Sequence, residues 1–219
     1  KLPFRPITGH AAENPTAESL NRFAFASLPG CRLVFVNGRY SAALSRTTAL
    51  PTGVTVASLA GVLATNPALV EKHLGRYSQT EDNALAALNM AFFEDGSFIQ
   101  IPAGTERADP IQLLFVANTQ ENGAAIQPRN LILAGAGCRL TVIESYVGLT
   151  TTPGFTNAVT ELVVEEGAAV EHLKFQDEAR ESFHLATLHG VFRRSSQVRL
   201  HSFALGARLS RNNIEAKLD

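Results

Sequence analysis

The feature that most constrains the fold is a strand pattern that recurs about every 30 residues in the C-terminal part of the chain. The stretches AGCRLTVIE, AAVEHLKF and SQVRLHSF each open with small or polar residues and continue with alternating apolar and polar positions. Leu140, Val170 and Val198 hold the same place in each, so the copies lie 30 and then 28 residues apart. Because one such coil cannot bury its own apolar side, we expect the copies to stack around a continuous core.

The whole region after Asp95 consists of short stretches rich in Val, Ile, Leu, Phe and Thr, bounded by Gly, Pro, Asn, Ser or charged residues, as is typical of strands. These stretches are EDGSFIQIP, PIQLLFVAN, NLILAG, CRLTVIESYV, AVTELVV, AVEHLKFQ, FHLATLHGVF, QVRLHSFALG and LSRNNIEAKL. No helix of ten or more residues fits between them, which argues against a doubly wound α/β sheet. A parallel β-helix and an antiparallel jelly roll of the cupin type both satisfy this pattern.

The first part of the chain has a mixed character, so we divide the chain into a helical and hairpin region over residues 1–94 and a mainly β core over residues 95–219. Arg32–Ser45 is typical of a β-hairpin, because Asn37-Gly38 supplies the two positive φ angles of a type I′ turn. Ser58 is the expected N-cap of a short helix. The expected helical stretches are Pro15–Gly30, Ser58–Leu63, Pro67–Gly75 and Asp82–Phe93.

Charge and cysteine usage exclude several classes of function. The net charge of −1 gives no electrostatic basis for binding nucleic acid or an anionic membrane surface. No apolar run approaches the roughly 20 residues that span a bilayer. The opening KLPFRPITGH lacks the apolar region of a signal peptide. Cys31 and Cys138 have no metal-site or redox spacing, which indicates ordinary thiols in a reducing compartment. We therefore expect a cytoplasmic location.

Histidines are the candidate metal ligands of the repeat region. His172, His184, His189 and His201 all lie there, and neutral imidazole is a good ligand. They are spread over several strands without tight spacing, so side chains that are satisfied locally or face solvent are the expected outcome. Cys138, and with it Tyr146, is expected to be part of a structural rung.

Acidic and basic pairs are the remaining candidates. Neighbouring carboxylates can act on sugars, and Glu165-Glu166, Asp177-Glu178 and Glu144 supply such groups. Glu165-Glu166 precedes Gly167 and is expected to form a solvated turn. Arg193-Arg194 occupies the equivalent turn of the next repeat and is too small for a nucleic-acid surface. These patterns leave open a secreted β-helix enzyme acting on polysaccharides and a cupin-like metal-binding protein.

Three stretches together resemble the SufB/SufD family of the SUF system for iron–sulfur cluster assembly. They are RLVFVNGRY at Arg32–Tyr40, LTVIESYVG at Leu140–Gly148 and HSFALGARLSRNNIEAKLD at His201–Asp219. The first favours the SufD branch of the family. The third is the most specific, with an Arg-x-Asn and a Leu-Asp close. Their order and spacing agree along nearly the whole chain.

This resemblance implies a right-handed parallel β-helix behind a small N-terminal α/β cap region. It also implies a non-catalytic scaffold subunit of the SufBCD complex that pairs with SufB, contacts the ATPase SufC and is linked to iron acquisition. A transient iron–sulfur cluster or iron is expected only in the complete complex, with no cofactor bound in this part.

Two departures limit what the resemblance transfers. Family chains are about twice this long, so the resemblance covers their N-terminal half to two-thirds. The family's interface histidine and cysteine and its SufC-binding segment would follow Asp219, and its N-terminal Trp-Lys-Tyr-Thr motif would precede this sequence. None of the histidines named above matches the interface histidine, so we assign no catalytic, cofactor-binding or metal residue. A β-helix interrupted between coils exposes strand edges and apolar core, so we also expect self-association through that end.

Overall fold

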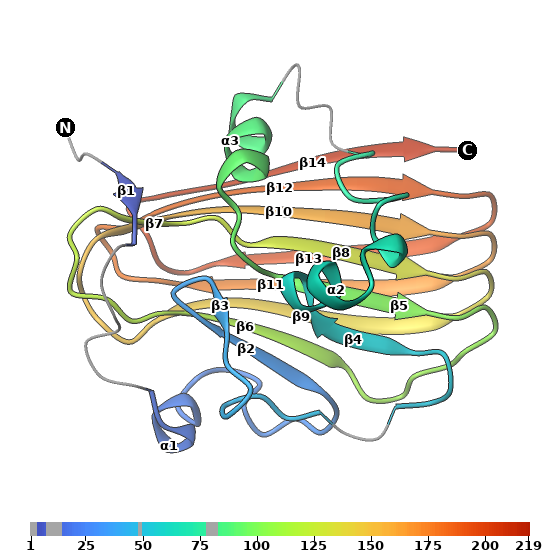
Figure 1. Cartoon of the computed structure of the whole chain (residues 1–219), viewed down its shortest axis with the longest axis horizontal. Coiled ribbons are helices and arrows are strands. Elements are labelled where there is room, and N and C mark those ends of the chain that lie inside the picture. Colours follow the sequence, from blue (N-terminus) through green and yellow to red (C-terminus); the bar gives the residue numbers. More distant parts are fainter. Residues whose placement is uncertain (1–3, 8–14, 48–49, 78–82) are drawn as a thin grey trace.

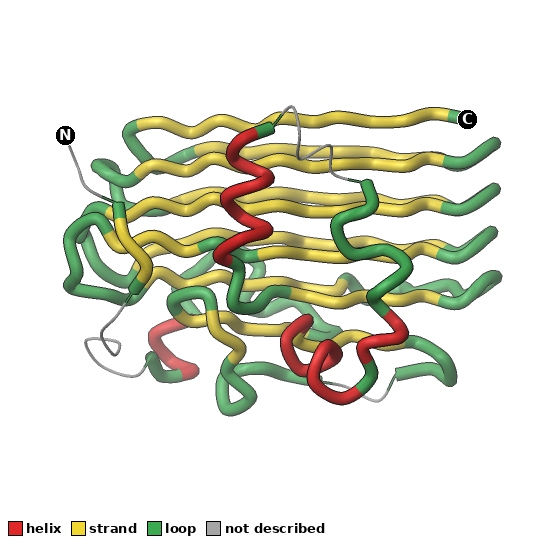
Figure 2. The backbone as a smooth tube through the Cα atoms, turned by 45° about the horizontal axis from the view of Figure 1, so that its top comes forward, coloured by secondary structure: helices red, strands yellow, loops and turns green. Residues whose placement is uncertain are grey.

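The protein is a β-solenoid in which successive coils stack on one another and their parallel strands form two facing sheets. The computed structural model describes residues 4–7, 15–47, 50–77 and 83–219, and the structural statements below concern these residues. About four turns of the coil are stacked, and each turn adds one strand to each sheet (Figures 1 and 2). The parallel pairing confirms the predicted β-helix and excludes the jelly-roll alternative. The right-handed sense of the coil stays a prediction.

Both sheets are built mainly from the predicted stretches. The eight-stranded sheet contains β1 (Arg5–Pro6), β4 (Thr55–Ser58), β5 (Ser97–Ile101), β7 (Ala124–Ile126), β8 (Arg129–Ala134), β10 (Gly154–Val164), β12 (Phe183–Phe192) and β14 (Leu209–Leu218). The six-stranded sheet contains β2 (Arg32–Val36), β3 (Arg39–Tyr40), β6 (Ile111–Ala117), β9 (Arg139–Gly148), β11 (Ala169–Asp177) and β13 (Gln197–Ala204). Among the described strands, only the pairs β2–β3 and β4–β5 are antiparallel. The short strands β1, β4 and β7 were not predicted.

The repeat register deduced from the sequence is confirmed. Val170 of β11 is the Cα partner of Leu140 in β9 and of Val198 in β13. The intervening strands follow the same rule in the other sheet, where Phe155 of β10 faces Phe183 of β12. Because side chains alternate between faces along a strand, this in-register stacking places equivalent positions of successive coils in columns.

The core fills the space between the two sheets, which we call the lumen. Its apolar columns include Leu33, Leu113 and Val142 from the six-stranded sheet and Ile132 and Leu162 from the other. Burying each such side chain stabilises the fold by about 1.5–3 kcal/mol. Two smaller apolar clusters lie outside the sheets and hold the helical segments against them. The alternation that predicted strands is therefore also what builds the core.

The first helix is much shorter than predicted. A helix over Pro15–Gly30 is wrong, because α1 spans only Ala17–Leu20 and turns follow it. Leu20 is fully buried in an apolar cluster beside the six-stranded sheet. Phe25 has a φ of 67° and its ring packs edge-on against Phe175 at 5.7 Å. Contacts with the sheet thus override the local helical periodicity.

The other helical predictions are partly confirmed. The Ser58 hydroxyl accepts from the Gly61 amide and caps α2 (Leu59–Thr65), as expected. Pro67–Gly75 is helical only as the 3₁₀ helix η1 (Pro67–Leu69) with turns after it. The third helix, α3 (Ala84–Phe92), lies across the outer face of the eight-stranded sheet near β10 (Figure 1). Its predicted start at residue 82 lies outside the described residues.

The predicted hairpin is confirmed, since Asn37 and Gly38 join β2 and β3 with φ angles of 51° and 82°. Strands from residues 1–94 join the same two sheets as those from residues 95–219, and the division at residue 95 stays a prediction.

None of the described helices is long and apolar enough to cross a membrane.

Candidate functional site

Charged and polar side chains replace apolar ones in one half of the lumen, in the coils formed by β9–β12. We call this group the lumen cluster: Glu144, Tyr146, His172, Lys174, Gln176, Glu178 and His184. Every member is at most 7% exposed. Burying an ionisable group costs free energy unless the group has a partner. The contacts among these side chains therefore determine which of them are charged.

Glu144 is the centre of one half of the lumen cluster. Its carboxylate lies 2.8 Å from His172 Nε2, and it accepts hydrogen bonds from Tyr146 at 2.5 Å and Thr160 at 3.1 Å. Burial alone would raise the pKa of Glu144. The hydrogen bond and charge of His172, the Tyr146 hydroxyl and the charge of Lys174 outweigh burial and lower that pKa to about 2. Glu144 is therefore a buried, ionised carboxylate.

Glu178 is the centre of the other half. One oxygen lies 2.7 Å from His184 Nδ1 and accepts from Gln176 Nε2 at 3.0 Å, while the other accepts from the Thr156 hydroxyl at 2.5 Å. Burial opposes ionisation, but His184 and the two hydrogen-bond donors lower the pKa of Glu178. Burial lowers the pKa of His184 despite the neighbouring carboxylate. The sequence places Glu178 in the turn after β11, and the structure turns its side chain inward.

Lys174 lies between the two halves. Its Nζ donates to Asn212 Oδ1 at 3.3 Å and lies 5.7 Å from the centre of the Tyr146 ring. Burial lowers the pKa of Lys174 to about 8, although Glu144 and Glu178 favour its charged form. Burial and Glu144 raise the pKa of Tyr146 well above its ordinary value. The lumen cluster thus combines the carboxylates of Glu144 and Glu178 with the ammonium group of Lys174 and the imidazoles of His172 and His184.

The four candidate histidines do not come together. His172 and His184 face the lumen, whereas His189 pairs with Glu215 at 3.2 Å and the exposed His201 pairs with Glu171 at 3.2 Å. Within the described ranges there is no group of three or more His, Cys, Asp or Glu side chains that could hold a metal ion.

The other predicted candidates take structural places. Glu165 and Glu166 lie exposed in a turn, as expected. Arg194 and Arg193 reach Glu166 and Asp219 respectively across the surface. Cys138 packs in the apolar core, and neither it nor Cys31 forms a disulfide.

The sequence identified Glu144 and Glu178 only as carboxylates that could act on sugars, and Lys174 and Gln176 were not identified as candidates. The available signal was the alternation of side chains along each strand. Glu144, Lys174 and Gln176 lie an even number of residues after Leu140 or Val170, so their side chains face the lumen.

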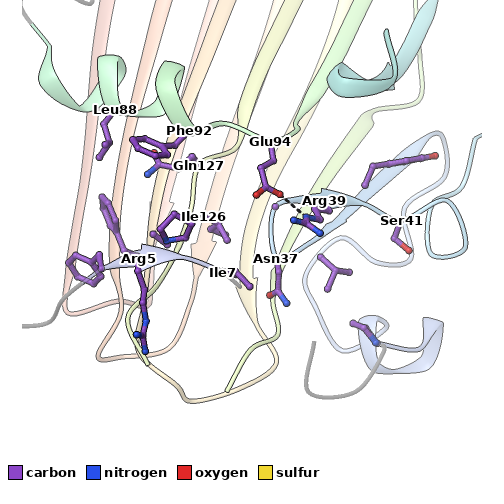
Figure 3. A pocket seen from close by; sticks show the side chains of 18 of the residues that line it. Arg5, Ile7, Asn37, Arg39, Ser41, Leu88, Phe92, Glu94, Ile126 and Gln127 are labelled. Carbon is purple, nitrogen blue, oxygen red and sulfur yellow. Dashed lines mark hydrogen bonds and ion pairs between the residues drawn. The ribbon is translucent and has the colours of Figure 1, made fainter. Parts of the chain in front are cut away.

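A separate cleft of about 650 Å³ lies outside the lumen, between α3, the β2–β3 hairpin and β1 (Figure 3). Leu88, Phe92 and Ile126 give it apolar walls. Arg39 and Glu94 form an ion pair at 2.6 Å beside it. The cleft has the size of a small-molecule site. Its Arg39 and Glu94 side chains, however, pair with each other and are exposed to solvent.

Comparison with known proteins covers almost the whole chain. Residues 115–219 match the family described as "SUF system FeS cluster assembly, SufBD core domain", and residues 22–113 match the "SufBD protein N-terminal region". An iron–sulfur cluster assembly SufBD family protein of Synechocystis is 34% identical over 193 residues, which are 84% of this chain and 42% of that protein.

Further relatives match a little more than half of this chain. A SufBD family protein of Arabidopsis thaliana, described as chloroplastic, is 36% identical over 60% of this chain and 24% of its own length. One from Staphylococcus aureus is 32% identical over 57% of this chain and 27% of its own. The chain thus spans less than half the length of these curated relatives.

Proposed function

This chain belongs to the SufB/SufD family of iron–sulfur cluster assembly proteins, and from that premise we propose that it is the SufD-type scaffold subunit of a SufBCD complex. In this role it pairs with SufB, contacts the ATPase SufC and helps to bring iron to the site of cluster assembly. It performs no catalysis of its own and works in the cytoplasm.

One observation supports this proposal above the others: both family regions match in order, on a single solenoid. Residues 22–113 and 115–219 are matched consecutively, and strands from both ranges hydrogen-bond within the same sheets. A rigid stack of parallel coils presents long lateral faces and two ends, which suits a subunit that holds other proteins. The side chains of the lumen cluster are buried and form hydrogen bonds mainly with one another.

The assignment to the SufD branch is supported by the hairpin sequence RLVFVNGRY. In the structure this segment forms β2 and β3 at the edge of the six-stranded sheet. A SufD subunit is expected to capture SufB, whereas a SufB subunit is expected to capture SufD. The identity of the captured partner therefore distinguishes the two branches.

The test is affinity capture from the native host with the intact protein, with the 219-residue chain in parallel, followed by mass spectrometry. We expect the intact protein to recover SufB and SufC homologues and the 219-residue chain to lose SufC. Recovery of neither homologue by the folded, intact protein would contradict the scaffold function. Recovery of a SufD homologue in place of SufB would move the chain to the other branch.

The polysaccharide-acting enzyme is the remaining alternative from the sequence. Such an enzyme needs two carboxylates that face each other across a groove. Glu165 and Glu166 do not meet this requirement, because they lie side by side in one exposed turn. The cupin-like alternative fails on the fold, since its strands would pair antiparallel. Lyase assays with the intact protein on acidic polysaccharides would detect the first, and we expect no turnover.

A further inference from the structure

The cleft between α3, the β2–β3 hairpin and β1 has the volume and the shape of a ligand site. It encloses about 650 Å³, which lies within the range of small-molecule sites. Leu88 and Phe92 extend from α3 toward Ile126 of β7 (Figure 3). Because a helix, a hairpin and a strand each supply one wall, a ligand in the cleft would be enclosed from several sides.

Aromatic side chains in this cleft remain open to solvent. Phe92 is 54% exposed and Phe4 is 39% exposed, and both line the cleft. The Phe4 ring packs on Phe155, and the two ring centres lie 4.8 Å apart. Exposed apolar groups that gather in a concave site mark binding surfaces. Aromatic walls favour a ligand with a flat apolar body, because such a body can stack on the rings.

The cleft also offers hydrogen-bond donors that the described residues leave unused. Arg39 donates to Glu94 through Nε at 2.6 Å, and its two terminal nitrogens have no partner among the described residues. Gln127 accepts from Asn157 Nδ2 at 2.7 Å through Oε1, so its Nε2 group keeps its donors. The terminal nitrogens of a guanidinium match the paired oxygens of an anionic group such as a carboxylate.

The charges of the described lining residues favour an anionic ligand. Arg5 and Arg39 contribute two positive charges, and Glu94 contributes one negative charge. An uncharged ligand would leave the surplus positive charge unpaired, and a cationic ligand would increase it. A ligand with one negative charge complements the cleft. Because Glu94 holds only the Nε side of the Arg39 guanidinium, the other edge of that group can bind a second anion.

We propose that this cleft binds a small molecule with a flat apolar body and one anionic group, such as a carboxylate or a sulfonate. The apolar body lies between Phe92 and Ile126, and Arg39 binds the anionic group. Glu94 orients the Arg39 guanidinium from its Nε side. This binding site goes beyond the scaffold function and does not depend on it, since the residues that form the site all belong to this chain.

The test titrates two fluorescent dyes into the intact protein. Anilinonaphthalene sulfonate has a flat apolar body and one sulfonate group, and phenylnaphthylamine is the same molecule without the sulfonate. We expect both dyes to bind, because both can stack on the aromatic walls of the cleft. Methyl NMR signals of Leu88 and Ile126 should shift when the anionic dye saturates the protein, which places that dye in the cleft.

Substitutions at two exposed side chains separate the charge from the apolar contact. Arg39→Gln should weaken binding of the anionic dye about fivefold or more and leave the neutral dye unchanged, because only the anionic dye pairs with Arg39. Phe92→Ala should weaken both dyes about fivefold, because it removes apolar contact area. The matched controls are Arg139→Gln, which breaks another exposed ion pair, and Phe203→Ala, at the opposite edge of the six-stranded sheet. Both control variants should bind the two dyes as the wild type does.

Three results would overturn the proposal. Unshifted Leu88 and Ile126 signals at saturating dye would show that the dye binds elsewhere or not at all. Unchanged affinity of both dyes in Phe92→Ala would remove the apolar site. An equal effect of Arg39→Gln on the two dyes would show that the cleft does not select for a negative charge. Because Arg39 and Phe92 are both more than half exposed, we expect the two variants to fold, and circular dichroism checks this.

Discussion

At the scale of single residues, the lumen cluster shows how a β-solenoid can tolerate charge in its core. Each buried carboxylate has a histidine and hydroxyl or amide donors around it, so its desolvation cost is offset by specific hydrogen bonds. Replacing such a pair by apolar side chains of the same shape is often neutral or stabilising, whereas removing one partner alone is strongly destabilising. The contribution of each pair to the stability of the fold depends on pH, because it requires the carboxylate to be ionised.

Glu144 is expected to make the fold sensitive to acid. Its folded-state pKa of about 2 lies below the ordinary value of 4.5, so its ionised form stabilises the fold above pH 4.5. That contribution, on the order of 3 kcal/mol, is lost progressively as the pH falls from about 5 toward 2. Urea unfolding of the wild type and of Glu144→Gln across this range measures it. The variant should show a flatter pH dependence, and parallel curves for the two proteins would contradict the assignment.

At the scale of elements, a second buried ion pair fixes the N-terminal segments to the outer face of the eight-stranded sheet. Arg129 of β8 pairs with Glu161 of β10, and both side chains are fully buried. Asn89 of α3 accepts from the Arg129 guanidinium at 3.0 Å. Glu161 also accepts from the backbone amides of Gly75 and Tyr77. One pair thus connects the sheet, α3 and the segment after η1.

Removing Arg129 should therefore loosen several elements at once. Arg129→Met leaves Glu161 buried without its cation, and we expect the free energy of unfolding to fall by about 3–5 kcal/mol. Hydrogen exchange should rise first in α3 and around Tyr77. The control is Arg139→Met, which breaks the exposed pair with Glu106 and should change stability by at most about 1 kcal/mol. Equal effects of the two substitutions would refute the role given to the buried pair.

The elements also show what a single sequence can reveal about this fold. Except for the short strands β1, β4 and β7, the strands, their register and the Asn37-Gly38 turn were predictable, because alternation and turn chemistry are local signals. The length of α1 was not, since burial of Leu20 and the packing of Phe25 on Phe175 depend on distant strands. The lumen cluster needed one further step. Once Val170 is assigned to the inside, His172, Lys174 and Gln176 must share its face, but which groups pair across the lumen depends on the stacking.

At the scale of the whole molecule, the lumen changes character along its axis. Phe35, Phe115 and Tyr146 stack in one column with ring centres 4.8 Å apart. The next positions in that column are Gln176 and Ala204. The interior therefore passes from aromatic in the first coils to polar in the later ones. The last coil, formed by β13 and β14, exposes a strand edge in each sheet.

This last coil is expected to drive self-association of the 219-residue chain. Leu205, Ile214 and Leu218 are 68%, 49% and 72% exposed there, beside backbone groups that no described strand pairs. Exposed strand edges and apolar patches recruit further strands. Light scattering should show dimers or larger species as concentration rises, and Ile214→Lys should shift them toward monomer. A strictly monomeric wild-type chain at high concentration would count against this expectation.

The central claim is that this chain is part of a SUF scaffold, and co-purification tests it most directly. The intact protein would be co-expressed with the SufB and SufC homologues of its own organism and purified through a tag on this protein alone. Light scattering on the eluted material would give the mass of the assembly. We predict one stable complex that contains all three proteins. Elution of the folded, intact protein without SufB and SufC would contradict the account.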